Sequence, residues 1–250
     1  MTSINFPYLA SFWSQPVVEV NLLVFFNLAG ALALGLMVGY ERSYHGRAAG
    51  MRTYGIVCMA SAAFTVFAGY PGFWFGGSGN THIVVDPTRV IQGIITGVGF
   101  LGAGVIMKDG LNISGLTTAA SIWASSAIGV LVGVGFYASA ILLTGLSVGL
   151  MMWGPKLESR LPSRRALGVK INFVQGLEPD ETELKRTIRV WGYMVAEGSL
   201  HITATRNQVT WEFVMVALQS RPDPSSLFAL SRKLREVAGV EQLEISHARN

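Results

Sequence analysis

Long apolar runs alternate with short polar connections over the first 155 residues, and this pattern predicts helices that cross a membrane. At about 1.5 Å per residue, each run can span the hydrocarbon core of a bilayer. The five predicted helices are Val20–Tyr40, Thr53–Gly69, Thr88–Met107, Thr117–Val132 and Phe136–Trp153. Only Gly133–Gly135 separates the last two runs. One continuous helix there would be roughly twice the bilayer thickness, so the pattern favours a tight helical hairpin.

The pattern changes near Pro155, where alternating polar and apolar positions replace the long apolar runs. This texture predicts strands at 168–174, 193–205, 209–218 and 240–247, with helices at 180–191 and 224–238. Asn207 and Gln208 suit a hairpin turn between the central strands, and Asp180 and Asp223 suit helix starts. The order βαββαβ is typical of the ferredoxin-like fold. We expect one face of its sheet to be free for pairing, so a homodimer is the simplest assembly.

The predicted fold class is therefore an all-α polytopic bundle of five transmembrane helices followed by an α+β ferredoxin-like domain. The predicted parts are an N-terminal tail at 1–19, a transmembrane domain at 20–154 and a polar domain at 155–250. Composition agrees, because half of the residues are hydrophobic and only 14% are charged. The net charge of +4 comes without basic tracts interleaved with aromatic residues, so nucleic acid is not an expected partner. The single cysteine, Cys58, excludes an intrachain disulfide and a cysteine-based metal site.

Basic residues predict the orientation in the membrane. Arginines and lysines follow the first, third and fifth apolar runs, whereas the opposite connections hold few of them. The positive-inside rule then places the N-terminus in the periplasm and the polar domain in the cytoplasm of a bacterial inner membrane. The first residues lack a basic n-region and a cleavage site, so the first helix is expected to serve as the targeting element.

Charges at the ends of the apolar runs are the first candidates for function, because an ion at a membrane edge is expensive unless it is paired. Glu41 lies among Arg42, Arg47 and Arg52 in the short connection Gly39–Thr53. We expect Glu41 to pair with Arg52 across that connection. At the opposite side we expect Asp86 to pair with Arg89 and to start a helix with Pro87 in its first turn.

Small and polar residues within the runs predict how the helices pack. Glycines four residues apart occur in four runs, at Gly35/Gly39, Gly93/Gly97, Gly129/Gly133 and Gly145/Gly149. This spacing lets helix backbones approach closely and predicts a tightly packed bundle. The polar residues at membrane depth are Asn27, Gln92, Thr96, Ser121, Ser125 and Ser126. None of them is ionisable, which argues against active ion transport through this chain alone.

Five successive blocks resemble the MgtC/SapB family of bacterial inner-membrane proteins. They are Gly35 to Arg42, Ala49 to Thr53, Asp86 to Val90, Gly97 to Ile106 and Gly115 to Ala120. The resemblance covers about Leu22 to Trp153 and rests on the order of the blocks. Tyr54 departs from the family pattern, which often has a histidine after the Arg-Thr pair. The polar domain is similar to the ACT-like domain that a subset of the family carries.

The resemblance implies a non-enzymatic regulator linked to virulence, survival inside macrophages and growth in low magnesium, with some members restraining the F-type ATP synthase. It implies no cofactor and no metal site, and it makes a membrane protein the expected partner. The candidate functional residues carried by the blocks are Glu41, Arg42, Arg52, Thr53, Asp86, Arg89, Gly99, Gly102, Gly104, Thr117 and Thr118.

Two other functions are weighed against regulation. A transporter or channel for Mg²⁺ or another cation could use Glu41, Asp86 and Asp109 as entrance carboxylates, because Mg²⁺ prefers oxygen ligands. An intramembrane enzyme would need an activated Ser121, Ser125 or Thr118, but no histidine or lysine lies at helical spacing from them. The first strand-to-helix loop of the polar domain, residues 175–179, could bind a small effector or serve protein docking.

Overall fold

A computed structural model of the chain describes residues 6–77, 86–109, 112–161, 166–174, 180–205, 208–218 and 226–247. The chain divides into two compact units, which are described separately here. One comprises Met1–Ile106 with Gly115–Pro155, and the other comprises Met107–Ser114 with Lys156–Asn250.

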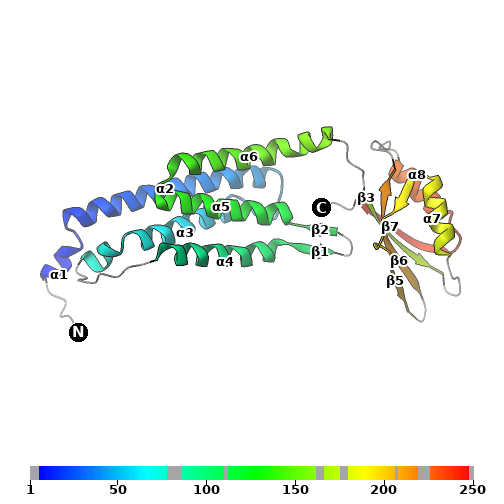
Figure 1. Ribbon diagram of the computed structural model, residues 1–250, viewed down its shortest axis with the longest axis horizontal. Coiled ribbons are helices and arrows are strands. Elements are labelled where there is room, and N and C mark those ends of the chain that lie inside the picture. The colour runs from blue at the N-terminus through cyan, green and yellow to red at the C-terminus, as the bar shows by residue number, and fades with distance from the viewer. Residues whose placement is uncertain are drawn as a thin grey trace. The chain divides into compact units, whose positions relative to one another are not determined.

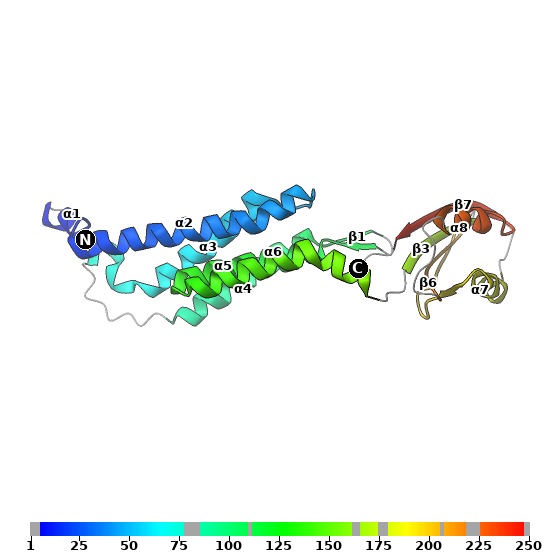
Figure 2. The ribbon, with the colours of Figure 1, turned by 90° about the horizontal axis from the view of Figure 1, so that it is seen from above.

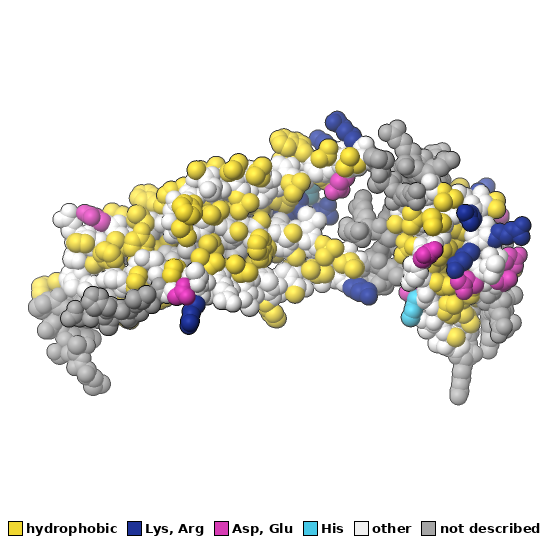
Figure 3. Space-filling model, in the orientation of Figure 1, with side chains coloured by type: hydrophobic (Ala, Val, Ile, Leu, Met, Phe, Trp, Pro, Cys, Tyr) yellow, Lys and Arg dark blue, Asp and Glu magenta, His cyan; other side chains and the backbone are white. Residues whose placement is uncertain are grey.

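The first unit is a bundle of long helices that run side by side (Figures 1 and 2). Five of the described helices are long and apolar enough to cross a membrane, which confirms the predicted five-helix class. They are α2 (Gln15–Tyr44), α3 (Met51–Gly69), α4 (Pro87–Val105), α5 (Leu116–Val134) and α6 (Tyr137–Arg160). Two short helices, α1 (Phe6–Ser11) and η1 (Pro71–Gly77), lie outside them. Hydrophobic side chains cover most of the face of the bundle seen in Figure 3.

Helix α2 is longer than the apolar run that predicts it. It begins at Gln15, where Ser14 is extended and Pro16 occupies the first turn, a position that needs no backbone donor. It ends at Tyr44, so Glu41 and Arg42 lie inside the helix and the polar connection shrinks to residues 45–50. The predicted hairpin is present between α5 and α6, where Gly135 adopts a left-handed φ of 96°.

The connection from α4 to α5 contains two strands that the hydrophobic pattern does not predict. Strand β1 (Met107–Asp109) pairs antiparallel with β2 (Asn112–Ser114). Gly115 follows with a φ of 88°, and a Cβ there would lie 2.0 Å from the Val105 carbonyl oxygen. Only glycine fits this position, because both the backbone angle and the contact exclude a side chain.

Helix α3 packs at backbone distance against α2 on one side and α5 on the other. A Cβ on Gly35 would lie 2.7 Å from the Tyr54 carbonyl oxygen, and one on Gly129 would lie 2.1 Å from the Cys58 carbonyl oxygen. The Gly35/Gly39 and Gly129/Gly133 pairs therefore make the close contacts that their spacing predicts.

The other two glycine pairs do not make such contacts within the chain. A Cβ on Gly93, Gly97 or Gly145 would meet no atom within 4 Å, and one on Gly149 would meet only Trp153 of its own helix. Among the described residues of α4 only Ile94, Val98 and Gly102 are buried, and in α6 only Ala140 and Thr144. Spacing alone does not say whether a neighbouring helix is present.

The second unit is an α/β domain. Besides β1 and β2, its described elements are β3 (Ala166–Phe173), α7 (Glu181–Val190), β4 (Tyr193–Val195), β5 (His201–Ala204), β6 (Val209–Ala217), α8 (Ser226–Arg235) and β7 (Val240–His247). The sheet has the order β4-β6-β3-β7, with β5 also on β6 and every pairing antiparallel. This is the strand order of the ferredoxin-like fold, as predicted. Both helices contribute to one core with the sheet, through Ile188 and Leu234 among others.

The predicted strand 193–205 is broken into β4 and β5, which pair with successive parts of β6. Gly198 adopts a φ of 74° in the intervening turn. The Ser199 hydroxyl accepts a hydrogen bond from the Val214 backbone N–H at 3.1 Å, so it replaces a strand partner there. The Asp180 carboxylate caps α7 as predicted, accepting from the Thr182 N–H at 2.8 Å. The predicted turn at Asn207, the Asp223 helix start and the 175–179 loop lie outside the described residues.

The face of the sheet opposite the helices carries polar pairs across its strands. Lys170 binds Glu212 at 2.6 Å, and the strand register places His201 and Glu244 on either side of this pair. One step along, Asn172 accepts from the Thr210 hydroxyl at 2.9 Å and donates to Gln242 at 3.1 Å. This face is therefore polar at these two rows.

A methyl group at the closest helix contact should loosen the bundle. We expect Gly129→Ala to lower the midpoint of thermal unfolding in detergent by several degrees, because its Cβ would overlap the Cys58 carbonyl. Gly97→Ala is the matched control, since its Cβ meets open space and alanine favours a helix by about 1 kcal/mol in water. Equal midpoints for the two variants would contradict the packing described here.

Candidate functional site

A buried ion pair lies in the last turns of α2. Glu41 and Arg42 are each only about 5% exposed, and the Arg42 guanidinium donates to the Glu41 carboxylate through Nε. The second oxygen of the carboxylate lies 3.0 Å from Nδ1 of His45, whose side chain is half exposed. The predicted partner Arg52 is exposed instead and forms no ion pair within the described part of the chain. The predicted pairing of Glu41 with Arg52 is therefore wrong.

The reason for this correction is where α2 ends. Because α2 continues to Tyr44, Glu41 lies inside the helix, next to Arg42 and one turn before His45, and it contacts both side chains. The Ser43 hydroxyl then accepts from the Met51 N–H at 3.0 Å and holds the start of α3 beside the end of α2. A Cβ on Gly39 would lie 2.6 Å from the Met51 Cα. The ion pair is enclosed because α2 and α3 pack this closely at Gly39, just before the pair in sequence.

A chain of hydroxyl groups joins α3 to α5 next to this pair. Tyr54 is fully buried, and its hydroxyl lies 2.6 Å from the Ser121 hydroxyl. The Ser121 hydroxyl lies 3.0 Å and the Tyr54 hydroxyl 3.5 Å from the Thr118 carbonyl oxygen, so either hydroxyl can be the donor between them. A Cβ on Gly39 would lie 3.0 Å from the Tyr54 Cβ, which places Tyr54 beside the last turns of α2. We call the ion pair of α2 and these hydroxyl residues the Glu41 cluster: Glu41, Arg42, His45, Tyr54, Thr118 and Ser121. All of them are buried except His45, whose side chain is half exposed.

The contact between α3 and α5 stays polar further along. Ser125 donates to the Tyr54 carbonyl at 3.0 Å, and the hydroxyls of Ser61 and Ser126 lie 2.8 Å apart. Thr65 donates to the Ser61 carbonyl at 2.8 Å within its own helix. Each of these buried hydroxyls is therefore hydrogen-bonded, as groups at membrane depth need to be.

The predicted site residues divide between two ends of the bundle. Glu41, Arg42, Arg52, Thr53, Gly104, Thr117 and Thr118 lie toward the end where α2 and α4 finish and α3 and α5 begin. Of these, Glu41, Arg42 and Thr118 are buried, and the other four are exposed. Asp86 and Arg89 lie at the other end of α4, roughly 28 Å away along a 19-residue helix. Between them on α4, Gly102 is buried and a Cβ there would lie 3.7 Å from the Ala119 Cβ, whereas Gly99 is exposed with open space around it.

Asp86 caps α4, as the sequence predicts. Its carboxylate accepts from the Thr88 N–H at 2.9 Å and from the Thr88 hydroxyl at 2.5 Å. The hydrogen bond from the Thr88 hydroxyl, and after it the one from the Thr88 N–H, hold the pKa of Asp86 below its ordinary value. Arg89 lies 3.7 Å away, and both side chains are exposed, so this is a surface ion pair of small energetic weight.

Three members of the Glu41 cluster were not on the candidate list drawn from the sequence. His45 was not considered, and Tyr54 was noted only as a departure from the family pattern. Ser121 was noted as a polar residue at membrane depth and as a nucleophile that an intramembrane enzyme would need. Helical spacing could have shown that His45 is one turn after Glu41. Tyr54 and Ser121 lie 67 residues apart in sequence, so their contact follows only from the packing of α3 on α5. Gly115 was likewise unlisted as a site residue, although its contact with Val105 allows no other residue.

The chemistry that the Glu41 cluster offers is electrostatic and structural. The carboxylate, guanidinium and imidazole satisfy one another, and the hydroxyls end on a backbone carbonyl. Among the described residues no three His, Cys, Asp or Glu side chains group together as metal ligands would. The exposed cations beside the cluster, Arg47 and Arg52, remain available to an acidic partner or to lipid headgroups.

Comparison with known proteins identifies the first unit. The profile described as MgtC family matches residues 28–160. Protein MgtC of Brucella abortus is 44% identical over 117 residues, which cover 47% of this chain and 45% of that protein. Protein MgtC of Salmonella typhimurium is 40% identical over 129 residues, or 50% of this chain and 51% of that protein. The matched region thus spans about half the length of these curated relatives. No solved structure matches the chain.

Breaking the buried pair should cost far more than removing the exposed cation. We expect Arg42→Leu to destabilise the protein by about 3 to 5 kcal/mol, because it leaves the Glu41 carboxylate buried without its charge partner. Arg52→Leu should change stability by about 0.5 kcal/mol or less. Thermal unfolding in detergent measures both, and adding Glu41→Gln to Arg42→Leu should restore part of the loss. If the two single variants unfold alike, the pairing is not as described.

The hydroxyl contact between α3 and α5 should be measurable by a double-mutant cycle. We expect Tyr54→Phe and Ser121→Ala to show a coupling energy of about 0.6 kcal/mol, with an upper limit near 1.7 kcal/mol, the range found for hydrogen bonds between membrane helices. Tyr44→Phe, at a tyrosine that is 77% exposed, is the control and should not couple to Ser121→Ala. A coupling energy of zero for Tyr54 would show that the bond does not contribute.

Proposed function

The chain belongs to the MgtC family, and from this premise we propose that it is a non-enzymatic regulator that acts by docking against a membrane protein in the bacterial inner membrane. The resemblance set out above suggests the partner, the F-type ATP synthase, and the setting, adaptation to low magnesium and survival inside macrophages. The curated relatives carry the name Protein MgtC, and the matched region covers about half of each.

The proposal rests on where the polar and the apolar side chains of the bundle lie. The buried hydroxyls of α3 and α5 are engaged in hydrogen bonds, and the Glu41 carboxylate is engaged with Arg42 and His45. In contrast, α4 and α6 present long apolar faces with few contacts inside the chain. This division supports docking more than it supports a lined path for ions or a catalytic centre.

The docking face that we propose lies on α4. Gly99 and Gly104 have open space where a Cβ would be, so a partner helix could approach the α4 backbone there. The exposed Phe100 adds apolar surface between them. In the proposed orientation, the Glu41 cluster and the second unit are cytoplasmic, because the basic residues Arg42, Arg47 and Arg52 gather at that end. The second unit would then assemble copies of the chain or bind an effector.

The proposal is tested in inverted membrane vesicles that contain the ATP synthase. We expect the full-length protein to slow ATP-driven proton pumping, measured by quenching of a pH-sensitive dye, and to crosslink to a synthase subunit. Gly99→Leu and Gly104→Leu should relieve both effects, because their side chains would fill the docking face. Gly69→Leu is the matched control, since Gly69 is also surrounded by open space but lies on α3.

Two outcomes would overturn the proposal. One is unchanged pumping together with no crosslinked membrane protein. The other is Mg²⁺ uptake by proteoliposomes of the purified protein above the level of empty vesicles, which would favour transport instead.

A further inference from the structure

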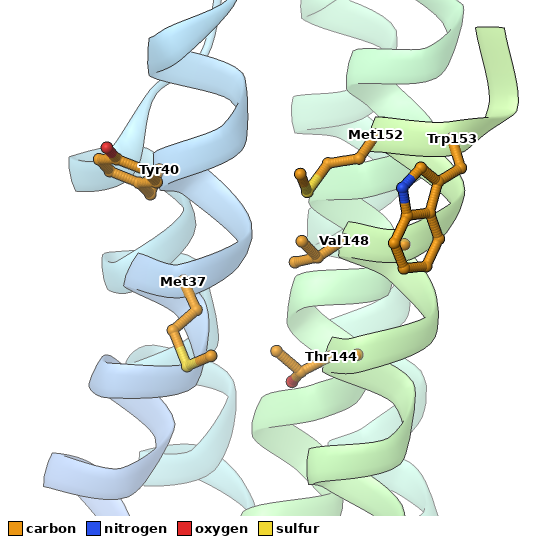
Figure 4. Close-up of a pocket in the computed structure, with 8 residues that line it drawn as sticks. Met37, Tyr40, Thr144, Val148, Met152 and Trp153 are labelled. Carbon is orange, nitrogen blue, oxygen red and sulfur yellow. The ribbon is translucent and has the colours of Figure 1, made fainter. Parts of the chain in front are cut away.

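A hollow opens between α2 and α6 toward the Glu41 end of the bundle. Its volume is about 400 Å³, and its lining includes Met37, Tyr40, Thr144, Gly145, Val148 and Met152. Figure 4 shows Thr144, Val148 and Met152 pointing from α6 toward α2, where Met37 and Tyr40 lie. A smaller hollow of about 240 Å³ lies between the same two helices near Gly30 and Ile141. We call the larger hollow the groove.

The walls of the groove are apolar. Its lining holds two hydroxyls. That of Thr144 donates to the Ala140 carbonyl at 2.8 Å and so needs no further partner, and that of Tyr40 lies at the Glu41 end. Gly145 leaves open space where a side chain would be, and methionine side chains from both helices provide adaptable apolar surface. Such a groove suits a flexible hydrocarbon chain.

The length of the hollow suits an acyl chain. The lining runs along α6 from Thr144 to Trp153, which is about 15 Å at 1.5 Å per residue. This is about half of the roughly 30 Å hydrocarbon core, the depth that the acyl chains of one leaflet occupy.

Aromatic residues mark the level at which a lipid headgroup would lie. Tyr40 and Trp153 line the hollow at its Glu41 end, and their rings are 60% and 65% exposed. Tyrosine and tryptophan gather at the interface between the hydrocarbon core and the headgroups. Helix α6 continues to Arg160, and Lys156 follows Met152 by one helical turn on the same face. A cation at this level favours an anionic headgroup.

We propose that an anionic phospholipid of the bilayer binds here, with one acyl chain in the groove between α2 and α6 and its phosphate near Lys156. The acyl chain packs between Met37 and Val148, and Tyr40 and Trp153 flank the start of the chain. This site is separate from the proposed docking face on α4 and does not depend on the proposed function.

Native mass spectrometry of the full-length protein, titrated with dioleoylphosphatidylglycerol, tests the groove. Gly145→Leu and Val148→Phe place a larger side chain in the hollow, and we expect each to weaken the first bound lipid at least about fivefold. Gly93→Leu is the matched control, because Gly93 also has open space around it but lies on α4, outside the groove. It should bind the lipid as the parent protein does. Circular dichroism confirms that all three variants fold.

The headgroup is tested with dioleoylphosphatidylcholine as the second probe. We expect the parent protein to prefer phosphatidylglycerol, and Lys156→Gln to remove that preference while Lys108→Gln retains it. Equal lipid binding by Gly145→Leu, Val148→Phe and the parent protein would overturn the groove as a lipid site. Loss of a copurifying membrane protein from those variants, with lipid binding unchanged, would assign the groove to a protein segment instead.

Discussion

Helix α3 makes backbone contact with two neighbours at once, and the other features of the helical unit depend on it. Gly35 and Gly39 bring α2 onto α3, and Gly129 and Gly133 bring α5 onto its other side. In a bilayer the hydrophobic effect does not drive helices together, so close packing and hydrogen bonds between helices have to do so. The hydroxyl pairs of Tyr54 with Ser121 and of Ser61 with Ser126 form because the backbones are this close. The three helices therefore form the most closely packed part of the unit.

The burial of Glu41 and Arg42 is a consequence of this packing. Gly39 holds α2 against the start of α3, and the next turn of α2 carries the two charges into the enclosed end of the bundle. A buried ion pair contributes little net stability, since desolvation offsets much of the attraction, whereas losing one partner is costly. The pair is therefore better explained as a fixed charge arrangement beside Tyr54 and the exposed Arg52 than as a source of stability.

Periodicity predicted the features that each segment determines by itself. The apolar runs gave the five helices, Gly133–Gly135 gave the hairpin, and the alternating pattern after residue 165 gave the order βαββαβ. Features that depend on a second segment were missed. The same glycine spacing occurs in α2 and in α4, but of these two only the α2 pair contacts another helix closely. The spacing describes the surface of one helix and does not say what packs against it. The partner of Glu41 depended on α2 extending past Tyr40, and an apolar run fixes a helix end only within a few residues.

Helix α6 has fewer buried residues than α2, α3 and α5. Its buried residues are Ala140 and Thr144, and the Tyr137 hydroxyl donates to Asn27 of α2 at 2.6 Å. Further along α6, Val148 and Met151 pack on the core but are only partly buried. The groove lies between α2 and α6 at this level, and none of the described side chains fills it. An empty apolar gap would lose packing contacts that a hydrocarbon chain supplies. A bound acyl chain would therefore act as the missing neighbour of α6, and the position of α6 relative to α2 would depend on the lipid that occupies the groove.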